Sequence, residues 1–152
     1  MKKKVLIIIV AIGYVIVTVL SLPDTPKVYS EDMDFLAITN PPIDVQGLVK
    51  SACYDCHSTE ASFPIYAYFP PISNWIKGHV RHGKGKLNFS KWESYTIEEK
   101  REILGLINDE IVKKEMPPSN YLIMHSDAEW SKKESEMVIS FINRLSQELE
   151  KP

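Results

Sequence analysis

The chain has 152 residues and a formal net charge of −2, from 18 basic and 20 acidic side chains. The first 23 residues hold three lysines and no acid, so the remainder carries 15 basic and 20 acidic side chains, a net charge of −5. This balance argues against a nucleic-acid-binding surface, which would be basic, and no nucleic-acid partner is expected. An acidic protein surface instead favours a basic protein partner through electrostatic steering.

The N-terminal segment, residues 1–22, has the composition of an export or anchoring sequence. Lys2, Lys3 and Lys4 precede an uncharged and nearly all-apolar run of 18 residues that ends at Leu22. The run is longer than a typical signal-peptide core and just long enough to span a bilayer. We expect an uncleaved, single-pass anchor in the cytoplasmic membrane, with the lysines inside and the remaining chain facing the periplasm. Cleavage near Val19–Leu20–Ser21, which would release a soluble periplasmic protein, is the alternative.

Residues 23–43 are predicted to form a linker, and residues 44–150 a single compact domain. The linker contains four prolines and several acidic residues and shows no helical period. Within it, residues 33–38 are apolar enough to lie against the domain.

The only two cysteines lie in Cys53–Tyr54–Asp55–Cys56–His57, the C-x-x-C-H signature of covalent c-type haem attachment. Each thiol can add to one haem vinyl group, and cysteines three apart on a helix point the same way. The histidine that follows can bind the iron as its proximal ligand. The motif therefore predicts one covalent haem c held by Cys53 and Cys56, with His57 on the iron.

Three other interpretations of the cysteines are weaker. A Cys53–Cys56 disulfide would close a very small loop and contribute little stability. A thioredoxin-like pair would need a βαβ pattern, which is not found nearby. A zinc site that adds His79 and His82 would miss the usual spacings of such sites.

The domain is predicted to be all-α, because no segment shows sustained alternation of apolar and polar residues. A first helix should begin at Asp44 as N-cap, with an apolar stripe that runs into the two cysteines. Residues 58–72 are rich in aromatics and proline and should form a loop over one haem edge. A helix from residue 71 or 73 should end at Gly83 and Gly85, and capping boxes at Thr96 and Ser131 should start two more helices.

The sixth iron ligand would bind on the side of the iron opposite His57, and two residues are candidates for it. Met116 lies directly after a helix, and Pro117 favours an extended backbone there, which suits a side chain that reaches inward from a loop. A methionine opposite histidine is a cytochrome c arrangement. His79, on the same helix face as Trp75, is the alternative, while His82 and His125 are expected to face solvent.

From Asn40 to about Phe141 the chain resembles the bacterial haem-binding domain family. The resemblance is carried by Asn40–Pro41–Pro42, by the C-x-x-C-H motif with Ser58, and by Trp75 with His79–Val80. Further matches follow in order: residues 87–90 with Trp92, residues 115–117, and residues 121–125. Two positions depart from the family, since Phe63–Pro64–Ile65–Tyr66 replaces a tryptophan-rich stretch and Lys84 stands where arginine is common.

The resemblance implies a small cytochrome c-like helical fold, with Cys53 and Cys56 as attachment points and His57 as axial ligand. The expected function is one-electron transfer between redox partner proteins outside the cytoplasmic membrane, without catalysis of its own. A haem-based sensor or gas-binding module, or a peroxidase-like enzyme, is the alternative, and both would need an open sixth position.

Overall fold

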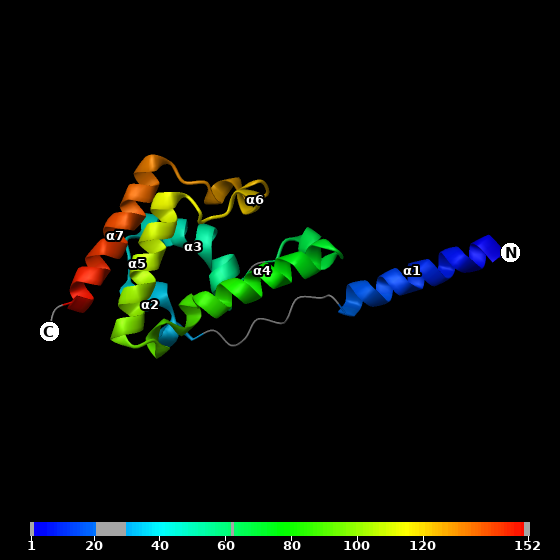
Figure 1. The fold of residues 1–152 in the computed structure, drawn as a ribbon, viewed down its shortest axis with the longest axis horizontal. Helices are drawn as coiled ribbons and strands as arrows, with labels where there is room; N and C mark the ends of the chain where they lie inside the picture. Colours follow the sequence, from blue (N-terminus) through cyan, green and yellow to red (C-terminus); the bar gives the residue numbers. More distant parts are fainter. Residues whose placement is uncertain (1, 21–29, 62, 151–152) are drawn as a thin grey trace.

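A computed structural model describes residues 2–20, 30–61 and 63–150 (Figure 1). Within these ranges the regular structure is entirely helical, which confirms the predicted all-α class. The α-helices are α1 (Lys2–Leu20), α2 (Phe35–Thr39), α3 (Ile43–His57), α4 (Ile72–Lys86), α5 (Ile97–Lys113), α6 (Ser119–Leu122) and α7 (Lys132–Glu150). Short 3₁₀ helices are η1 (Glu31–Met33), η2 (Ile65–Tyr68), η3 (Phe89–Ser94) and η4 (Ser126–Ala128).

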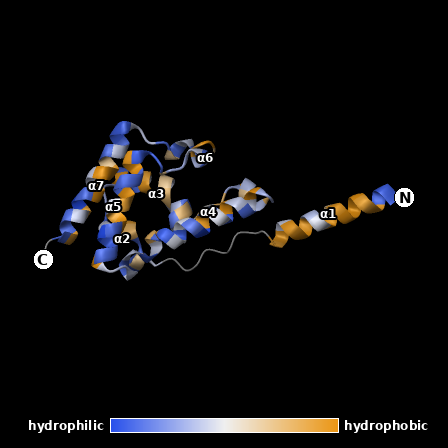
Figure 2. Cartoon of the chain, in the orientation of Figure 1, coloured by the Kyte–Doolittle hydropathy of each residue, from blue (hydrophilic) through white to orange (hydrophobic). Residues whose placement is uncertain are grey.

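Helices α3, α5 and α7 enclose the core, and α4 extends away from them (Figure 1). Helix α7 has one hydrophobic and one hydrophilic side (Figure 2), and it buries Val138, Phe141 and Ile142. Both predicted capping boxes are present. Thr96 Oγ1 accepts from the Glu99 amide at 3.2 Å, and Ser131 Oγ accepts from the Glu134 amide at 3.3 Å. Local sequence chemistry therefore sets where α5 and α7 begin.

The predicted bounds of two helices differ from the structure. Helix α3 begins at Ile43 behind Pro42, so Asp44 lies in the first turn, where its charge complements the helix dipole, rather than at the N-cap. Helix α4 does not end at Gly83 and Gly85 but continues through them to Lys86. Tertiary packing explains the second difference, because Gly83 is buried against α3, and packing overrides the weak helix propensity of glycine.

The segment from Glu31 to Thr39, placed in the linker by its sequence, is helical and packs into the fold. The Asp34 carboxylate caps α2 by accepting from the amides of Leu36 and Ala37, and the Phe35 side chain is completely buried. The ring of Phe35 lies 4.9 Å from those of both Phe89 and Trp92. The core therefore includes a residue that precedes the predicted start of the domain.

Helix α1 is hydrophobic along nearly all of its length (Figure 2), and none of its residues is buried. It is long and apolar enough to cross a membrane, and an N-terminal export signal would have the same properties. Residues 21–29, which include Ser21 of the possible cleavage site and the first seven residues of the predicted linker, lie outside the described residues.

Candidate functional site

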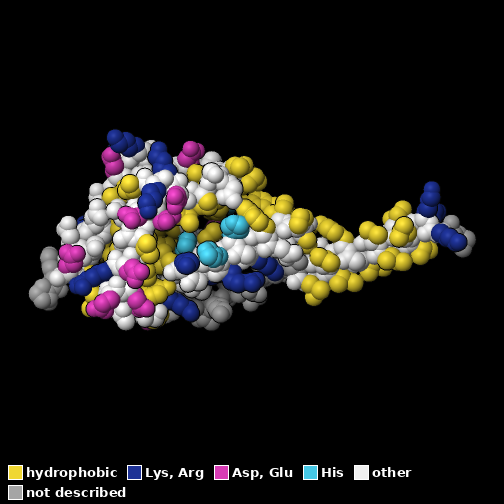
Figure 3. Space-filling model, viewed as in Figure 1, with side chains coloured by type: hydrophobic (Ala, Val, Ile, Leu, Met, Phe, Trp, Pro, Cys, Tyr) yellow, Lys and Arg dark blue, Asp and Glu magenta, His cyan; other side chains and the backbone are white. Residues whose placement is uncertain are grey.

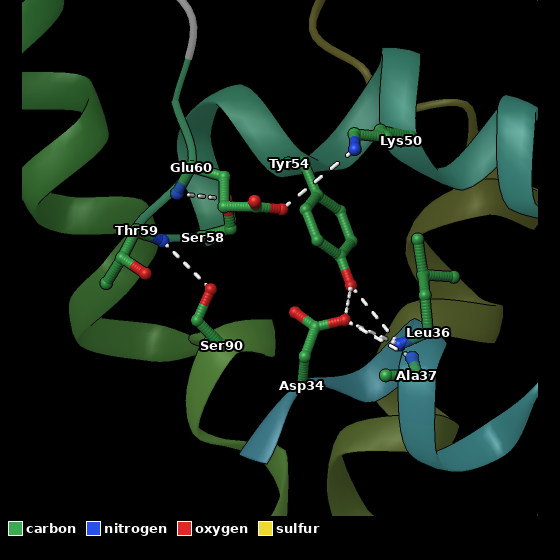
Figure 4. Close-up of polar contacts among 9 residues, drawn as sticks. All are labelled: Asp34, Leu36, Ala37, Lys50, Tyr54, Ser58, Thr59, Glu60 and Ser90. Carbon is green, nitrogen blue, oxygen red and sulfur yellow. Dashed lines mark hydrogen bonds and ion pairs between the residues drawn. The ribbon is translucent and has the colours of Figure 1, made fainter. Parts of the chain in front are cut away.

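The last turn of α3 carries the C-x-x-C-H motif, and Tyr54 fixes this turn to the rest of the fold. The Tyr54 side chain is buried, and its ring stacks on Phe89 at 5.3 Å with an interplanar angle of 5°. Its hydroxyl donates to Asp34 Oδ1 at 2.9 Å (Figure 4). The contacts of Tyr54 with α2 and η3 thus hold in place the turn that bears the two thiols and the imidazole.

The segment after the motif is fastened as well. The amide of Thr59 donates to Ser90 Oγ at 3.1 Å, and the Ser58 hydroxyl accepts from the amide of Glu60 at 2.9 Å (Figure 4). Ser58 is completely buried. These contacts connect the end of α3 to η3, so the chain leaves the motif in a defined direction.

The two cysteines are free thiols in different surroundings. Cys53 packs against the hydrophobic core, and burial raises the pKa of its thiol to about 12. Cys56 lines a cavity. Burial and the Asp55 carboxylate raise the Cys56 pKa, while the Lys84 ammonium opposes them. Cys56 therefore lies at the cavity, and Cys53 lies partly buried against the core.

His57 is held in one defined tautomer. Its Nδ1 lies 3.2 Å from the carbonyl oxygen of Leu87, and because a carbonyl can only accept, Nδ1 must carry the proton. The other ring nitrogen, Nε2, is left with its lone pair. Burial lowers the pKa of His57 in spite of opposing hydrogen bonds to the backbone of Leu87 and Gly83, so the ring is neutral at pH 7. A neutral imidazole with one nitrogen tied to a carbonyl is the usual state of a metal-binding histidine.

Gly83 lets α4 approach the motif closely enough to form this contact. A Cβ at Gly83 would lie 2.7 Å from the backbone oxygen of Cys56, a distance that side chains do not tolerate. The close approach of α4 to α3 also positions Leu87, which directly follows α4 and holds His57. The positions of the thiols and of the imidazole therefore depend on this glycine.

A cavity of about 270 Å³ opens beside Cys56, between the end of α3, η2, α4 and α6. Its lining is mainly apolar and aromatic and includes Phe63, Tyr66, Ile72, Trp75, Ile76, Val80, Tyr121 and Met124. His79 and His125 are the histidines in the lining. Figure 3 shows histidine side chains gathered near the middle of one face, among hydrophobic and basic side chains.

A chain of aromatic contacts closes the cavity on the α6 side. The Tyr121 hydroxyl lies 2.9 Å from Asp55 Oδ2 and 3.1 Å from the Ser51 carbonyl. The Tyr121 ring stacks on His125 at 4.1 Å, and the hydroxyl of Tyr66 lies 2.8 Å from His125 Nε2. Burial and the Asp55 carboxylate raise the pKa of Tyr121, so its hydroxyl keeps its proton. Asp55, in the middle of the motif, thus connects α3 to the cavity wall.

The two predicted distal ligands lie in different places. His79 lines the cavity, and its Nδ1 lies 3.0 Å from the Trp75 carbonyl, which leaves Nε2 with a lone pair. Met116, in the loop after α5, is 43% exposed and is not among the lining residues, although Pro118 is. Of the histidines expected to face solvent, His82 is exposed, whereas His125 is partly buried in the cavity wall. The cavity lining brings together Cys56, His79 and His125, whereas Cys53, His57 and Met116 are not part of it.

Tyr121 and Met124 have no individual role predicted from the sequence, and Tyr66 was expected only as part of the loop over one haem edge. Tyr121 and His125 are four apart, a spacing that brings side chains together on one helical turn. This spacing is a local indication in the sequence of their contact. The contact of Tyr66 with His125 joins residues 59 positions apart, which no local pattern reveals. Within the described residues, no three His, Cys, Asp or Glu side chains converge as metal ligands.

Comparison with known proteins identifies the family. A family model described as a haem-binding domain matches residues 8–144. The chain belongs to the haem-binding domain family. The match starts within α1 and takes in every helix from α2 to α6 and most of α7. No curated protein and no solved structure matches the chain.

The residues present suit the cofactor that the name of the haem-binding domain implies. Imidazole nitrogens with free lone pairs are iron ligands, and an apolar, aromatic cavity is the surrounding that excludes water from a porphyrin. His57, His79 and the cavity beside Cys56 supply these features within one region of the fold. The chain is therefore a haem-binding protein, and imidazoles that suit iron lie at the end of α3 and on α4.

Proposed function

We propose that the protein is a membrane-anchored monohaem c-type cytochrome that transfers single electrons outside the cytoplasmic membrane. The observation that carries the proposal is the contact of His57 Nδ1 with the Leu87 carbonyl, directly after the two thiols of the motif. This contact orients the imidazole and leaves Nε2 able to bind iron, while burial keeps the ring neutral. Bound haem c would supply the one-electron redox centre.

In this proposal, Cys53 and Cys56 hold the cofactor through thioether bonds, and His57 is the proximal ligand. The aromatic wall formed by Tyr66, Trp75 and Tyr121 excludes water from the cavity. Partner proteins that deliver or accept electrons remain unidentified, and α1 would keep the protein at the membrane.

Covalent attachment is tested by extracting the purified protein with acidic acetone. Haem c should stay with the protein, and the pyridine haemochrome spectrum should be that of two thioether links. Replacing Cys56 with alanine should leave one link and shift the haemochrome maximum, and replacing both cysteines should release all haem into the acetone. Complete extraction of haem from the unmodified protein would overturn the c-type assignment.

The distal ligand is tested by two substitutions and a control. His79 is favoured by its place in the cavity, and Met116 by its loop beside Pro118. Substitution of the residue that binds the iron, His79→Ala or Met116→Ala, should open the sixth position. The absorption spectrum of that variant alone should then change on addition of carbon monoxide. His82→Ala serves as the control, because His82 is exposed and does not line the cavity.

A gas-binding sensor or a peroxidase-like enzyme is the second candidate, and one observation favours it. Met116 lies outside the cavity, while the Tyr66–His125 pair provides polar groups inside it. Both functions require an open sixth position. Rapid carbon monoxide binding by the unmodified protein would replace the electron-transfer proposal with this one, and inertness to carbon monoxide would support electron transfer.

A further inference from the structure

The short helix η2, which precedes α4, and the residue that follows it expose three hydrophobic side chains outside the cavity. Ile65 is 79% exposed, Phe69 is 46% exposed, and Tyr68 is also exposed. None of the three is among the residues that line the cavity, so a group bound there leaves them on the surface. We call these three residues the tip. It projects from the body formed by α3, α5 and α7 (Figure 1), and a projecting apolar group of this kind marks an interaction site.

The sequence around the tip is basic, in contrast to the acidic remainder. Residues 61–92 contain four lysines and one arginine and neither aspartate nor glutamate, so this segment carries a charge of +5. The rest of residues 24–152 therefore carries −10. Arg81 is exposed on α4, nine residues after Ile72, which is about 13 Å along the helix from its start. The helix that follows the tip therefore carries an exposed positive charge in its middle.

The short segment between α1 and the folded unit limits how far the folded unit can lie from the membrane. Ten peptide steps separate Leu20, at the end of α1, from Ser30, and they extend at most about 35 Å. If α1 spans the bilayer, the folded unit stays within that distance of the lipid headgroups. The bilayer surface is then present at a very high effective concentration.

We propose that the tip and α4, through Arg81, dock on the surface of an anionic bilayer. Ile65, Tyr68 and Phe69 enter the interface between headgroups and acyl chains, and Arg81 contacts lipid phosphates. Exposed apolar and aromatic side chains beside basic residues are typical of surfaces that bind anionic membranes. The acidic remainder of the domain faces away from the lipid. Docking would turn the α4 side of the cavity toward the membrane.

Hydrogen exchange on the full chain in lipid nanodiscs tests the proposal. One set of discs contains phosphatidylcholine only, and the other also contains phosphatidylglycerol, with one protein in each disc. Helix α1 inserts equally in both, so any difference reports on the folded unit. Amides of residues 63–76 should exchange at least about threefold more slowly in the anionic discs. The difference should disappear at high salt, which screens the attraction.

Matched variants assign the effect to the tip and to Arg81. Arg81→Glu should lower the ratio of docked to undocked protein, as calculated from the exchange of residues 63–76, by about fivefold or more. Lys132→Glu on α7 should leave this ratio unchanged. Ile65→Ser with Phe69→Ser should abolish the protection, whereas Ile97→Ser with Leu106→Ser, which change exposed residues of α5, should keep it.

Two outcomes would overturn the proposal. Equal exchange in both kinds of disc would exclude anionic lipid as the occupant. Protection that appears only when several proteins share one membrane would show that a second copy covers the tip. Haem content, measured in parallel, should be the same in all four variants, so a failure of docking leaves the proposed haem site intact.

Discussion

At the scale of single residues, the two thiols of the motif differ although they lie one helical turn apart. Cys53 faces the core, whereas Cys56 faces the cavity and lies near the Lys84 ammonium. Only the thiolate reacts as a nucleophile, so burial suppresses the reactivity of Cys53 more than that of Cys56. The haem-free protein should reveal this difference directly.

In the haem-free Cys56→Ser variant, Cys53 should alkylate slowly at pH 8. Because its pKa is raised to about 12, its thiolate fraction, and with it the rate, should keep rising tenfold per pH unit beyond pH 9. An unperturbed thiol would level off near pH 9. The Cys53→Ser variant, which retains Cys56, should react faster at every pH. Rates are measured by mass spectrometry after timed addition of iodoacetamide. Equal rates for the two variants would contradict the burial of Cys53.

At the scale of helices, the contact of α3 with α4 is set by one glycine. Gly83 lies against the backbone oxygen of Cys56, which belongs to a helix and cannot move aside as a flexible side chain could. Two other glycines of α4, Gly78 and Gly85, have open space where a Cβ would be placed. These three positions on one helix therefore provide a controlled comparison.

We expect Gly83→Ala to destabilise the protein by about 1–3 kcal/mol, because the added methyl group must push α4 away from α3. Gly85→Ala should instead leave stability unchanged or raise it by up to about 1 kcal/mol, since alanine is the better helix former. Chemical denaturation followed by circular dichroism measures both effects. A neutral Gly83→Ala would mean that the two helices do not pack as closely as the structure places them.

Phe35 provides a second test at this scale, because it belongs to the five-residue helix α2. Its ring contacts Phe89 and Trp92 and is fully buried, so Phe35→Ala should cost about 3–5 kcal/mol of unfolding free energy. Ile38→Ala, on the same helix but 40% exposed, should cost about 1 kcal/mol or less. Similar losses for the two variants would contradict the central position of Phe35.

The helices that could be predicted from the sequence are those with strong local chemistry. The capping boxes at Thr96 and Ser131 and the apolar stripes behind them indicate α5 and α7 without tertiary information. The continuation of α4 through Gly83 could not be predicted, because it depends on a contact with Cys56 across the fold. Residues 33–38 were expected to lie against the domain, although prolines on either side give the segment the composition of a linker. The packing of the Phe35 ring on Phe89 and Trp92 could not be predicted, because it depends on contacts across the fold.

The candidate site also combines features that the sequence predicts with features that depend on the fold. The thiols and His57 could be predicted because their spacing within one motif carries the chemistry. The hydrogen bond of His57 to Leu87, 30 residues away, and the position of His125 beside Tyr66 depend on the fold. Whether Met116 or His79 binds the iron stays a prediction, and the substitutions described above decide it.

At the scale of the whole molecule, α1 and the folded unit are separate in composition and burial. Helix α1 has no buried residue, whereas the domain has its own core. The described fold begins at Ser30, so a chain that starts at residue 30 should fold, and one that starts at residue 44 should not, because it lacks Asp34 and Phe35. Cooperative thermal unfolding of both chains, followed by circular dichroism, checks this. A cooperative transition in the shorter chain would place the start of the domain after α2, as its sequence predicts.

If α1 is an uncleaved anchor, the mature protein should keep residues 2–20 and stay in the membrane pellet after alkaline carbonate extraction. Intact-mass measurement and immunoblotting of the two fractions check this. Replacing Ile9 and Val10 with lysine should move the protein out of the pellet, since each central charge costs about 2.5–3.5 kcal/mol of insertion free energy. A soluble protein that lacks residues 2–20 would show cleavage instead.

The burial of Tyr54 has a consequence for the order of events during biogenesis. This residue lies between the two cysteines, yet its hydroxyl reaches Asp34, twenty positions earlier, and its ring is enclosed by Phe89. If haem is attached covalently to this motif, as proposed, attachment should be easier before α2 and η3 enclose Tyr54. Chains with Phe35→Ala, which weakens the docking of α2, should then be loaded with haem at least as completely as the unmodified chain.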